Sequence, residues 1–449
     1  MTERRVIRLP YGGAGMDVVV PAENLAAVLE PRPVSPASDP VRDIEEALDR
    51  PMGTPPVAEL ARGRRSAIVI CDDLTRPTPA WLALPPVLER LERAGIPRGD
   101  ILIMMALGTH RPMTQAEMER KVGREVMARY EVVNSEFWLE DKLRFLGEVD
   151  RLPLYVDRRV MEADLKLSIG TVLPHPAAGW GGGGKMICPG VAGERTVRSL
   201  HYLQGATPRN LFGDVSSPVR VAIEKWAATV GLDFTLNLVL TGKGEVYRVT
   251  GGHYVQSHRE AVNLALEVMG APFRERSEIV IVDSHPADLD LWQATKALTA
   301  GDLVAADGGT VVLVTPCPEG VGPHAELPEY IGAPEVEPLL ERIRRGEVAE
   351  PIAASGSATL VRLAQRVRFG LVSGGVGRSE AEAMRFAFYS HAQEAVDRLL
   401  RQYGPQTRVT IILQGAETLP HPARHETLTG SLERGSTGYG ESRYTGEAT

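Results

Sequence analysis

Short runs of apolar residues alternate with longer amphipathic stretches along most of the chain. The runs "SAIVICDD" (66–73), "DILIMMALGTH" (100–110) and "EADLKLSIGTVLPH" (162–175) are apolar, and each of them ends in a polar loop. Such runs are typical of buried strands, and the amphipathic stretches between them predict helices. This alternation predicts an α/β fold with mainly parallel sheets.

Three stretches indicate where helices begin, end or are interrupted. "PAWLALPPVLERLERAG" predicts a helix that is interrupted near Pro85 and Pro86, because proline lacks the amide hydrogen that a helix interior needs. "TQAEMERKVGREVMARY" predicts one helix, with Thr114 as its N-cap and Glu117 completing a capping box. A third helix is expected from about Gly193, with His201 near its end.

The alternation restarts after roughly residue 270. "SEIVIVDSHP" (277–286), "GGTVVLVTPCPEG" (308–320) and "TRVTIIL" (407–413) predict strands, and "DLDLWQATKALTAG" (288–301) predicts a helix ending at Gly301. A chain of 449 residues is also too long for one ordinary core. We therefore predict an N-terminal α/β domain over 1–270 and a C-terminal one over 271–415. Residues 430–449 have too few apolar side chains to form a buried core and are predicted to be disordered.

Composition narrows the class of protein. The net charge of −8 argues against nucleic acid or an anionic membrane as the main partner. The three cysteines are scattered, which disfavours a disulfide framework, and no run approaches eighteen apolar residues. These features favour a protein of the reducing cytoplasm and leave open a local basic pocket for a small anion.

Polar side chains follow three of the predicted strands. Asp72 and Asp73 lie near the start of "CDDLTRPTP" (71–79). His110 ends "ALGTH", and His175 stands between two prolines. Loops at the carboxyl ends of parallel strands lie at one edge of a sheet, so these three could meet in one crevice. Arg76 offers a planar fork for a carboxylate or phosphate. Each histidine could be a general base, a metal ligand or a loop residue without a role in catalysis.

The stretch "PHPAAGWGGGGKMICPG" (174–190) has a glycine run that leads into Lys185. From Gly179 it follows the phosphate-loop pattern up to the last position, where Met186 replaces the hydroxyl residue that would bind magnesium. An accessible lysine can bind phosphate or form a covalent bond. A nucleotide-dependent kinase or ligase is therefore one interpretation of this stretch.

Two further interpretations are a zinc hydrolase and a binding protein without turnover. A zinc hydrolase would use His110, His175 and His201, but no H-E-x-x-H spacing is present. In the second half, Gln293 and Lys296 are three residues apart, which places them on one helical face beside Trp292. The residues alone leave these alternatives open.

Five motifs, taken together and in order, resemble the nickel-pincer lactate racemase (LarA) family. They are "DDLTRP", "GTHRPMT", "PHPAAGWGGGGK…PG", the later His201 and "WQATKAL", and the similarity extends from about residue 60 to 415. The resemblance implies two α/β domains with an active-site cleft between them. It also implies a racemase or epimerase of a 2-hydroxy acid, with cofactor-biosynthesis proteins as partners.

The family's cofactor is a nickel pyridinium-3,5-bisthiocarboxylic acid mononucleotide. The resemblance implies the following residue roles: Lys185 as the covalent tether, His201 as the nickel ligand, Asp73, Leu74, Thr75 and Arg76 as cofactor contacts, Arg76, Gln293 and Lys296 as substrate contacts, and His110 and His175 as the acid/base pair. Trp292 stands where well-known members are expected to have tyrosine. The implied substrate is therefore lactate or a larger 2-hydroxy acid.

Overall fold

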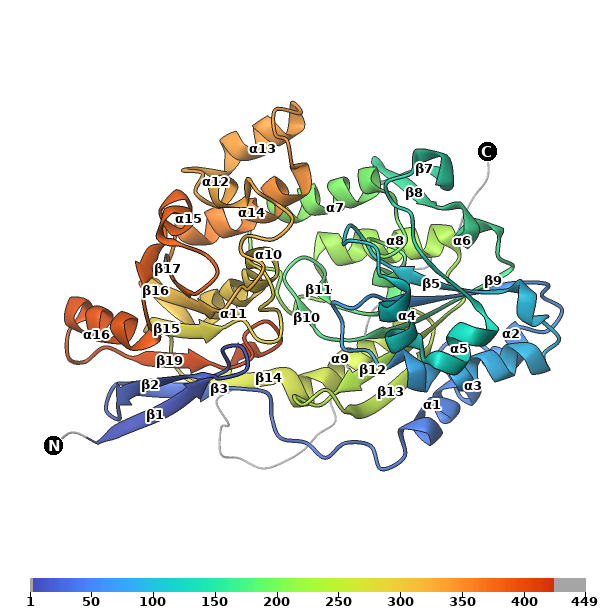
Figure 1. Ribbon diagram of the computed structural model, residues 1–449, viewed down its shortest axis with the longest axis horizontal. Helices are drawn as coiled ribbons and strands as arrows, with labels where there is room; N and C mark the ends of the chain where they lie inside the picture. Colours follow the sequence, from blue (N-terminus) through green and yellow to red (C-terminus); the bar gives the residue numbers. More distant parts are fainter. Residues whose placement is uncertain (1–2, 424–449) are drawn as a thin grey trace, which may run out of the picture.

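The computed structural model describes residues 3–423, which form two α/β halves side by side, each built on a six-stranded sheet (Figure 1). In the first sheet only β13 is antiparallel to its neighbour. The strand order is β13 (Val246–Gly252), β12 (Phe234–Leu240), β9 (Leu165–Thr171), β4 (Ala67–Asp72), β5 (Ile101–Ala106) and β6 (Glu131–Asn134).

The second sheet is parallel throughout. Its order is β18 (Ala387–Tyr389), β17 (Arg368–Ser373), β16 (Ala305–Thr315), β15 (Ser277–Asp283), β19 (Val409–Ile412) and β3 (Leu25–Leu29). Four two-stranded ribbons complete the strands: β1 (Arg4–Leu9) with β2 (Met16–Pro21), β7 (Leu143–Val149) with β8 (Leu152–Asp157), β10 (Pro174–His175) with β11 (Gly179–Trp180), and β14 (Gly270–Phe273) with β20 (Leu419–Pro422).

Helices cover both faces of the first sheet. Strand β4 is buried along its whole length, and successive side chains of a strand point to opposite faces. Val69 and Cys71 pack with residues of α1 (Pro40–Asp49) and α3 (Ala80–Arg93). Ile68 and Ile70 pack with α7 (Glu194–Ala206) and α8 (Pro218–Val230). This double burial explains why the strand has a continuous apolar sequence.

The remaining helices are distributed between the two halves. The first half also contains α2 (Val57–Leu60), α4 (Gln115–Val122), α5 (Arg124–Arg129), α6 (Arg158–Glu162) and α9 (Gln256–Met269). The second contains α10 (Leu291–Ala294), α11 (Lys296–Val304), α12 (Leu327–Ile331), α13 (Val336–Arg344), α14 (Pro351–Ala364), α15 (Arg378–Ala383) and α16 (Ala392–Tyr403). Within the described residues, no helix is long and apolar enough to cross a membrane.

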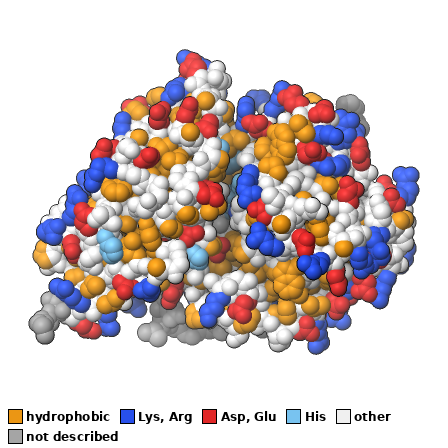
Figure 2. Space-filling view, in the orientation of Figure 1, with side chains coloured by type: hydrophobic (Ala, Val, Ile, Leu, Met, Phe, Trp, Pro, Cys, Tyr) orange, Lys and Arg blue, Asp and Glu red, His pale blue; other side chains and the backbone are white. Residues whose placement is uncertain are grey.

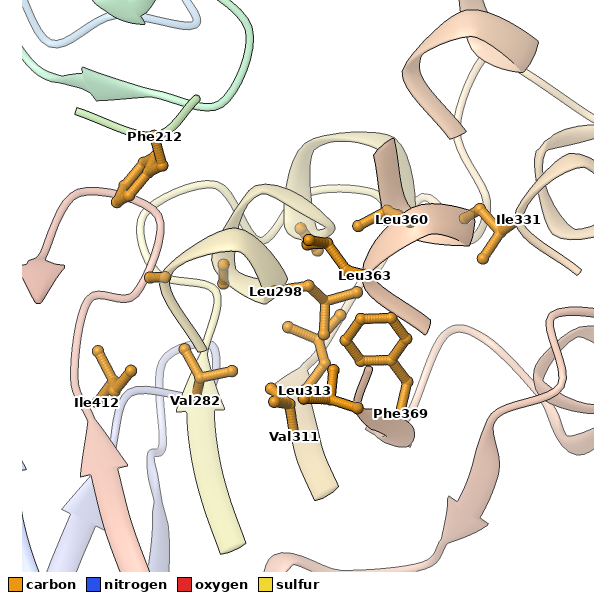
Figure 3. Packing of buried hydrophobic residues seen from close by; sticks show 14 of the residues in the cluster. Phe212, Val282, Leu298, Val311, Leu313, Ile331, Leu360, Leu363, Phe369 and Ile412 are labelled. Atoms are coloured by element: carbon orange, nitrogen blue, oxygen red, sulfur yellow. The ribbon is translucent and has the colours of Figure 1, made fainter. Parts of the chain in front are cut away.

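The two halves share a continuous apolar core. Phe212 from the first half belongs to the same buried cluster as Val282, Leu298 and Phe369 of the second (Figure 3). Helix α7 also packs closely on α14, where a Cβ atom added to Gly205 would lie 2.5 Å from a backbone oxygen of α14. This contact fixes α7 against the second half and thereby helps to position the residues between the halves.

The predicted α/β class with mainly parallel sheets is confirmed, as is the capping box of Thr114 and Glu117. Three details of the predicted helices were wrong. Helix α3 continues through Pro85 and Pro86, since its apolar face is held on the sheet on both sides of them. The stretch after Thr114 forms two helices, α4 and α5, because Gly123 takes a left-handed backbone angle (φ 91°).

The third incorrect detail is the helix predicted to end at Gly301. It is divided at Thr295 into α10 and α11, and α11 continues to Val304. The boundary near residue 270 stays a prediction, but strand β3 is hydrogen-bonded to β19 in the second sheet although it lies in the first thirty residues. The tail predicted over 430–449 lies outside the described residues.

Candidate active site

A groove separates the two halves on the face shown in Figure 2, and histidine side chains are visible in it. The loops that follow β4, β5 and β9 enter this groove from the first half, and α10 and α11 enter from the second. Two hollows adjoin there: an inner pocket, which also contains Lys185 and His201, and an outer cleft, which also contains Leu74 and Glu417. They share ten lining residues, namely Asp73, Thr75, Arg76, Thr109, His110, His175, Gly181, Trp292, Gln293 and Lys296.

His110 is oriented by a carboxylate. Its Nδ1 atom lies 2.7 Å from Oδ2 of Asp73, and the other oxygen of Asp73 accepts hydrogen bonds from the backbone N–H (3.0 Å) and hydroxyl (2.6 Å) of Thr75. Burial would raise the pKa of Asp73, but His110, Thr75 and Arg76 together lower it well below its usual value. The carboxylate therefore stays ionised and accepts the Nδ1 proton, so that Nε2 of His110 carries the lone pair.

Two basic side chains, Lys296 and Arg76, line the same pocket. The Lys296 ammonium donates a hydrogen bond to Oε1 of Gln293. Burial, together with the charge of Arg76, lowers the pKa of Lys296 to about 7. The planar fork of Arg76 beside a lysine that is partly protonated near neutral pH is suited to bind a carboxylate.

The glycine run before Lys185 is shaped by packing against the protein. Gly182 and Gly183 have left-handed backbone angles (φ 69° and 56°), and a Cβ atom at Gly183 would lie 2.9 Å from the ring of His258. The amide of Gly183 donates to Oδ1 of Asn237 (3.0 Å). Left-handed geometry and close packing against the protein therefore account for glycine at these two positions.

Lys185 lies within the 3₁₀ turn Gly183–Met186, and its side chain lines the inner pocket. Burial lowers the pKa of its amine well below the ordinary value, and the charges of Arg76 and Lys296 lower it further. A lysine in such surroundings loses its proton more easily than an exposed one, and its unprotonated amine can act as a nucleophile.

His201 lies on α7 and also lines the inner pocket. Its Nδ1 atom is 3.0 Å from Oε1 of Gln204, whose amide nitrogen lies 3.4 Å from the hydroxyl of Thr359. Since the Gln204 oxygen accepts the Nδ1 proton, Nε2 keeps a lone pair. Burial lowers the pKa of His201 to about 4, despite an opposing effect of Gln204. His201 is thus uncharged and able to bind a metal.

The structure brings together nearly all the residues that the sequence singled out. Those that line the inner pocket are Asp73, Thr75, Arg76, His110, His175, Lys185, His201, Gln293 and Lys296. Leu74 lines the outer cleft instead. Sequence reasoning missed Gln204, although its three-residue spacing from His201 on one helix was a usable signal. It also missed His324, which contacts Trp292 edge to face with ring centroids 4.9 Å apart.

Lys121 is another residue that the sequence did not reveal. Only 5% of its side chain is exposed, and its ammonium lies 2.8 Å from Oδ1 of Asp72. It also donates to the backbone oxygens of Asp73 (3.0 Å) and Arg76 (2.9 Å). Lys121 therefore holds both ends of the loop that carries Asp73 and Arg76.

We expect the substitution Lys121→Met to lower the free energy of unfolding by about 3–5 kcal/mol, because it leaves the Asp72 carboxylate buried without its cation. Lys225→Met is the matched control, since Lys225 pairs with Asp150 on the surface and should contribute less than about 1 kcal/mol. Denaturant midpoints of both variants measure the difference. Equal midpoints would show that Lys121 does not stabilise the loop.

Comparison with known proteins gives a consistent result. The model for the lactate racemase N-terminal domain matches residues 11–213, and that for the lactate racemase C-terminal domain matches 274–419. The lactate racemase of Thermoanaerobacterium thermosaccharolyticum is 26% identical over 70% of this chain and 75% of its own length. The lactate racemase of Lactiplantibacillus plantarum is 28% identical over 70% of this chain and 76% of its own length.

Two solved structures share the fold. The lactate racemase apoprotein from T. thermosaccharolyticum superposes with a TM-score of 0.84 at 22% identity, covering 93% of this chain and 100% of that one. A protein from Thermotoga maritima superposes with a TM-score of 0.66 at 18% identity, covering 85% and 98%. The fold and the pocket define a two-domain α/β enzyme of the isomerase class. The chain belongs to the lactate racemase family.

Proposed function

We propose that this protein interconverts the enantiomers of a 2-hydroxy acid. We further propose that it uses a nickel pyridinium-3,5-bisthiocarboxylic acid mononucleotide that is tethered to Lys185, with His201 as the nickel ligand from the protein. The observation that carries this proposal is that Lys185, whose amine has a lowered pKa, and the uncharged His201 line the same pocket as Arg76 and Lys296.

The pocket offers few metal-binding atoms, which fits a metal that is already bound by donors of a cofactor. Among residues 3–423, no three His, Cys, Asp or Glu side chains lie close enough to hold a metal ion. His201 offers one nitrogen, because Gln204 occupies the other. One imidazole added to donors supplied by a cofactor suits the tetragonal preference of Ni²⁺.

The chain's own residues then bind and orient the substrate. Arg76 and Lys296 hold its carboxylate, and Gln293 keeps the ammonium of Lys296 in place through their hydrogen bond. His110 and His175 are proposed to contact the hydroxyl oxygen, and Nε2 of His110 has the lone pair needed to accept its proton. When bound, the cofactor supplies an acceptor for the C2 hydrogen together with its electron pair.

The structure of the glycine loop argues against the alternative of a phosphate-loop kinase or ligase. In phosphate loops, free backbone N–H groups surround the phosphates. Here the amide of Gly183 donates to Asn237, and a side chain at Gly182 would meet Val172 at 2.7 Å. The loop is packed against the protein, and Met186 supplies no hydroxyl for magnesium.

The substrate is proposed to be lactate or a larger 2-hydroxy acid. Two relatives are named lactate racemases, and Trp292, which stands beside the pocket, is a bulky contact for whatever group the substrate carries on C2. The outer cleft continues from this point between the two halves.

Measuring racemisation across a panel of chiral 2-hydroxy acids tests the proposal. The protein should be produced together with the cofactor-biosynthesis enzymes, and chiral chromatography should follow each pure enantiomer. We expect one or more acids to racemise, and protein produced without those enzymes to be inactive. Racemisation by the cofactor-free protein, or none by protein that contains nickel, would refute the proposal.

A further inference from the structure

The outer cleft is the space that remains for the rest of the substrate. Lys185 and His201, the proposed tether and nickel ligand, line only the inner pocket, whereas Arg76 and Lys296 line both hollows. A substrate whose carboxylate is held by Arg76 and Lys296, with C2 toward the cofactor, therefore has the outer cleft for its remaining chain. This cleft is the larger of the two hollows, so it has room for a chain of several carbons.

Glu417 enters this cleft from a well-anchored turn. The turn follows β19, and the N–H groups of Glu417 and Thr418 both donate to the backbone oxygen of Gln414 (2.9 Å each). The N–H of Gln414 in turn donates to the buried carboxylate of Asp283 (3.0 Å). Ala416 and Thr418 on either side are buried, while Glu417 is partly exposed and lines the cleft. The backbone of Glu417 is thus fixed before any substrate binds.

The carboxylate of Glu417 has no partner among residues 3–423, where it accepts no hydrogen bond and forms no ion pair. Burial raises the pKa of Glu417 to about 7, although the basic groups of Arg76, His285 and Lys296 oppose this increase. A carboxylate that is poorly solvated and has no donor bound to it gains from a hydrogen-bond donor on a ligand. The cleft therefore contains an acceptor that a substrate can satisfy.

The surroundings of Glu417 decide which kind of donor suits it. An ammonium group on the substrate would be repelled by Arg76 and, when it is protonated, by Lys296. A second carboxylate would be repelled by Glu417 itself and by Asp290 and Glu319, which line the same cleft. An apolar chain would cover the carboxylate without giving it a partner. A hydroxyl group is uncharged and donates one hydrogen bond, so it avoids all three penalties.

A second acceptor lines the same cleft. The Nδ1 atom of His324 lies 3.3 Å from the carboxylate of Glu350, which accepts its proton, so Nε2 of His324 keeps a lone pair. The ring of His324 is held by its edge-to-face contact with Trp292. Two acceptors in one cleft suit a chain that carries more than one hydroxyl group.

We propose that the substrate is a polyhydroxy acid, a 2-hydroxy acid whose chain continues into the outer cleft and carries at least one more hydroxyl group, and that Glu417 accepts the hydrogen bond of that hydroxyl. This inference rests on the proposed function and narrows its substrate class. Glu417 then determines specificity without contacting the atoms that react. Lactate carries only a methyl group beyond C2, leaves this carboxylate without a partner, and is expected to be a poor substrate.

Pairs of acids with equal chain length test the inference in wild-type protein loaded with cofactor. Glycerate is lactate with one more hydroxyl, and gluconate is 2-hydroxyhexanoate with a hydroxyl on each further carbon. Chiral chromatography follows inversion at C2 for each acid. We expect kcat/KM to be about 10–100-fold higher for the hydroxylated member of at least one pair. A smaller advantage in both pairs would overturn the inference.

Variants of Glu417 test its part in this preference. Glu417→Met removes the acceptor at nearly constant length, so the ratio of kcat/KM between the two members of a pair should fall to within about 3-fold of one. Glu417→Gln keeps an oxygen acceptor without the charge and should retain part of the preference. Glu347→Met changes an exposed glutamate outside both hollows and should keep the wild-type ratio. If Glu417→Met also keeps that ratio, the inference fails.

Failure of this inference differs from failure of the proposed function. If wild-type protein that contains nickel inverts C2 of none of these acids, the proposed function fails and the inference fails with it. If the same protein inverts these acids without the expected preference, the proposed function stands and only the inference fails.

Discussion

Lys185→Ala should yield protein with no covalent mass increment, no bound nickel and no racemase activity, even when it is produced together with the cofactor-biosynthesis enzymes. The physical reason lies in the surroundings of the amine, where burial and the nearby charges of Arg76 and Lys296 lower its pKa and so favour the unprotonated, nucleophilic form. Intact-mass spectrometry, metal analysis and chiral chromatography measure the three losses.

Two further variants separate attachment from charge. Lys185→Arg keeps a positive group in the pocket but removes the nucleophile, so it should lose the mass increment as completely as the alanine variant. Lys225→Ala removes an exposed lysine that pairs with Asp150, and it should keep full mass increment and activity. A mass increment that survives in Lys185→Ala would show that the tether is elsewhere.

The parallel strands and the loops that contribute to the site could be predicted because their chemistry is local. Asp73, His110 and His175 each follow an apolar strand, and in a parallel sheet such positions share one edge. Strands β9, β4 and β5 are indeed neighbours in the first sheet, and all three side chains line one pocket. Gln293 and Lys296 were predicted to share a helix face, and their side chains are hydrogen-bonded across the break at Thr295.

Other features depend on contacts between distant segments, which periodicity does not encode. Lys121 appears in the sequence as one more charge on an amphipathic helix, yet it is buried under the loop 73–76. Arg220 lies on α8 and anchors the ribbon that carries His175, about forty residues earlier. Strand β3 crosses to the second sheet because its partner is β19, nearly four hundred residues away in sequence.

The hydrogen-bond partners of His110 and His175 could not be predicted for the same reason. The partner of Nδ1 is a carboxylate from another strand for His110 and two local amides for His175. Only the second partner is close in sequence. The pattern His-Pro-Ala-Ala is compatible with such a turn, but it does not require one.

We expect Asp73→Asn to lower kcat/KM by roughly 10²–10⁴-fold, because it reverses the tautomer of His110. Both hydrogen bonds from Thr75 go to Oδ1 of Asp73, so the carbonyl oxygen of asparagine must remain there and its amide group must face His110. That amide donates to Nδ1, and the ring proton moves to Nε2, where the proton acceptor is needed. An equivalent change costs about 10⁴-fold in a serine protease triad.

The Asp73→Asn variant should keep its nickel, its mass increment and its fold, since Lys185 and His201 are untouched and the bonds to Thr75 survive. The ring spectrum of His110 should change from the Nδ1–H to the Nε2–H pattern, which a purely structural role for Asp73 would not predict. Asp164→Asn is the control, because Asp164 pairs with the exposed Arg65 and should leave activity unchanged. Activity within about 10-fold of wild type in Asp73→Asn would mean that His110 does not depend on this carboxylate, and that proton exchange with the substrate is carried by another group.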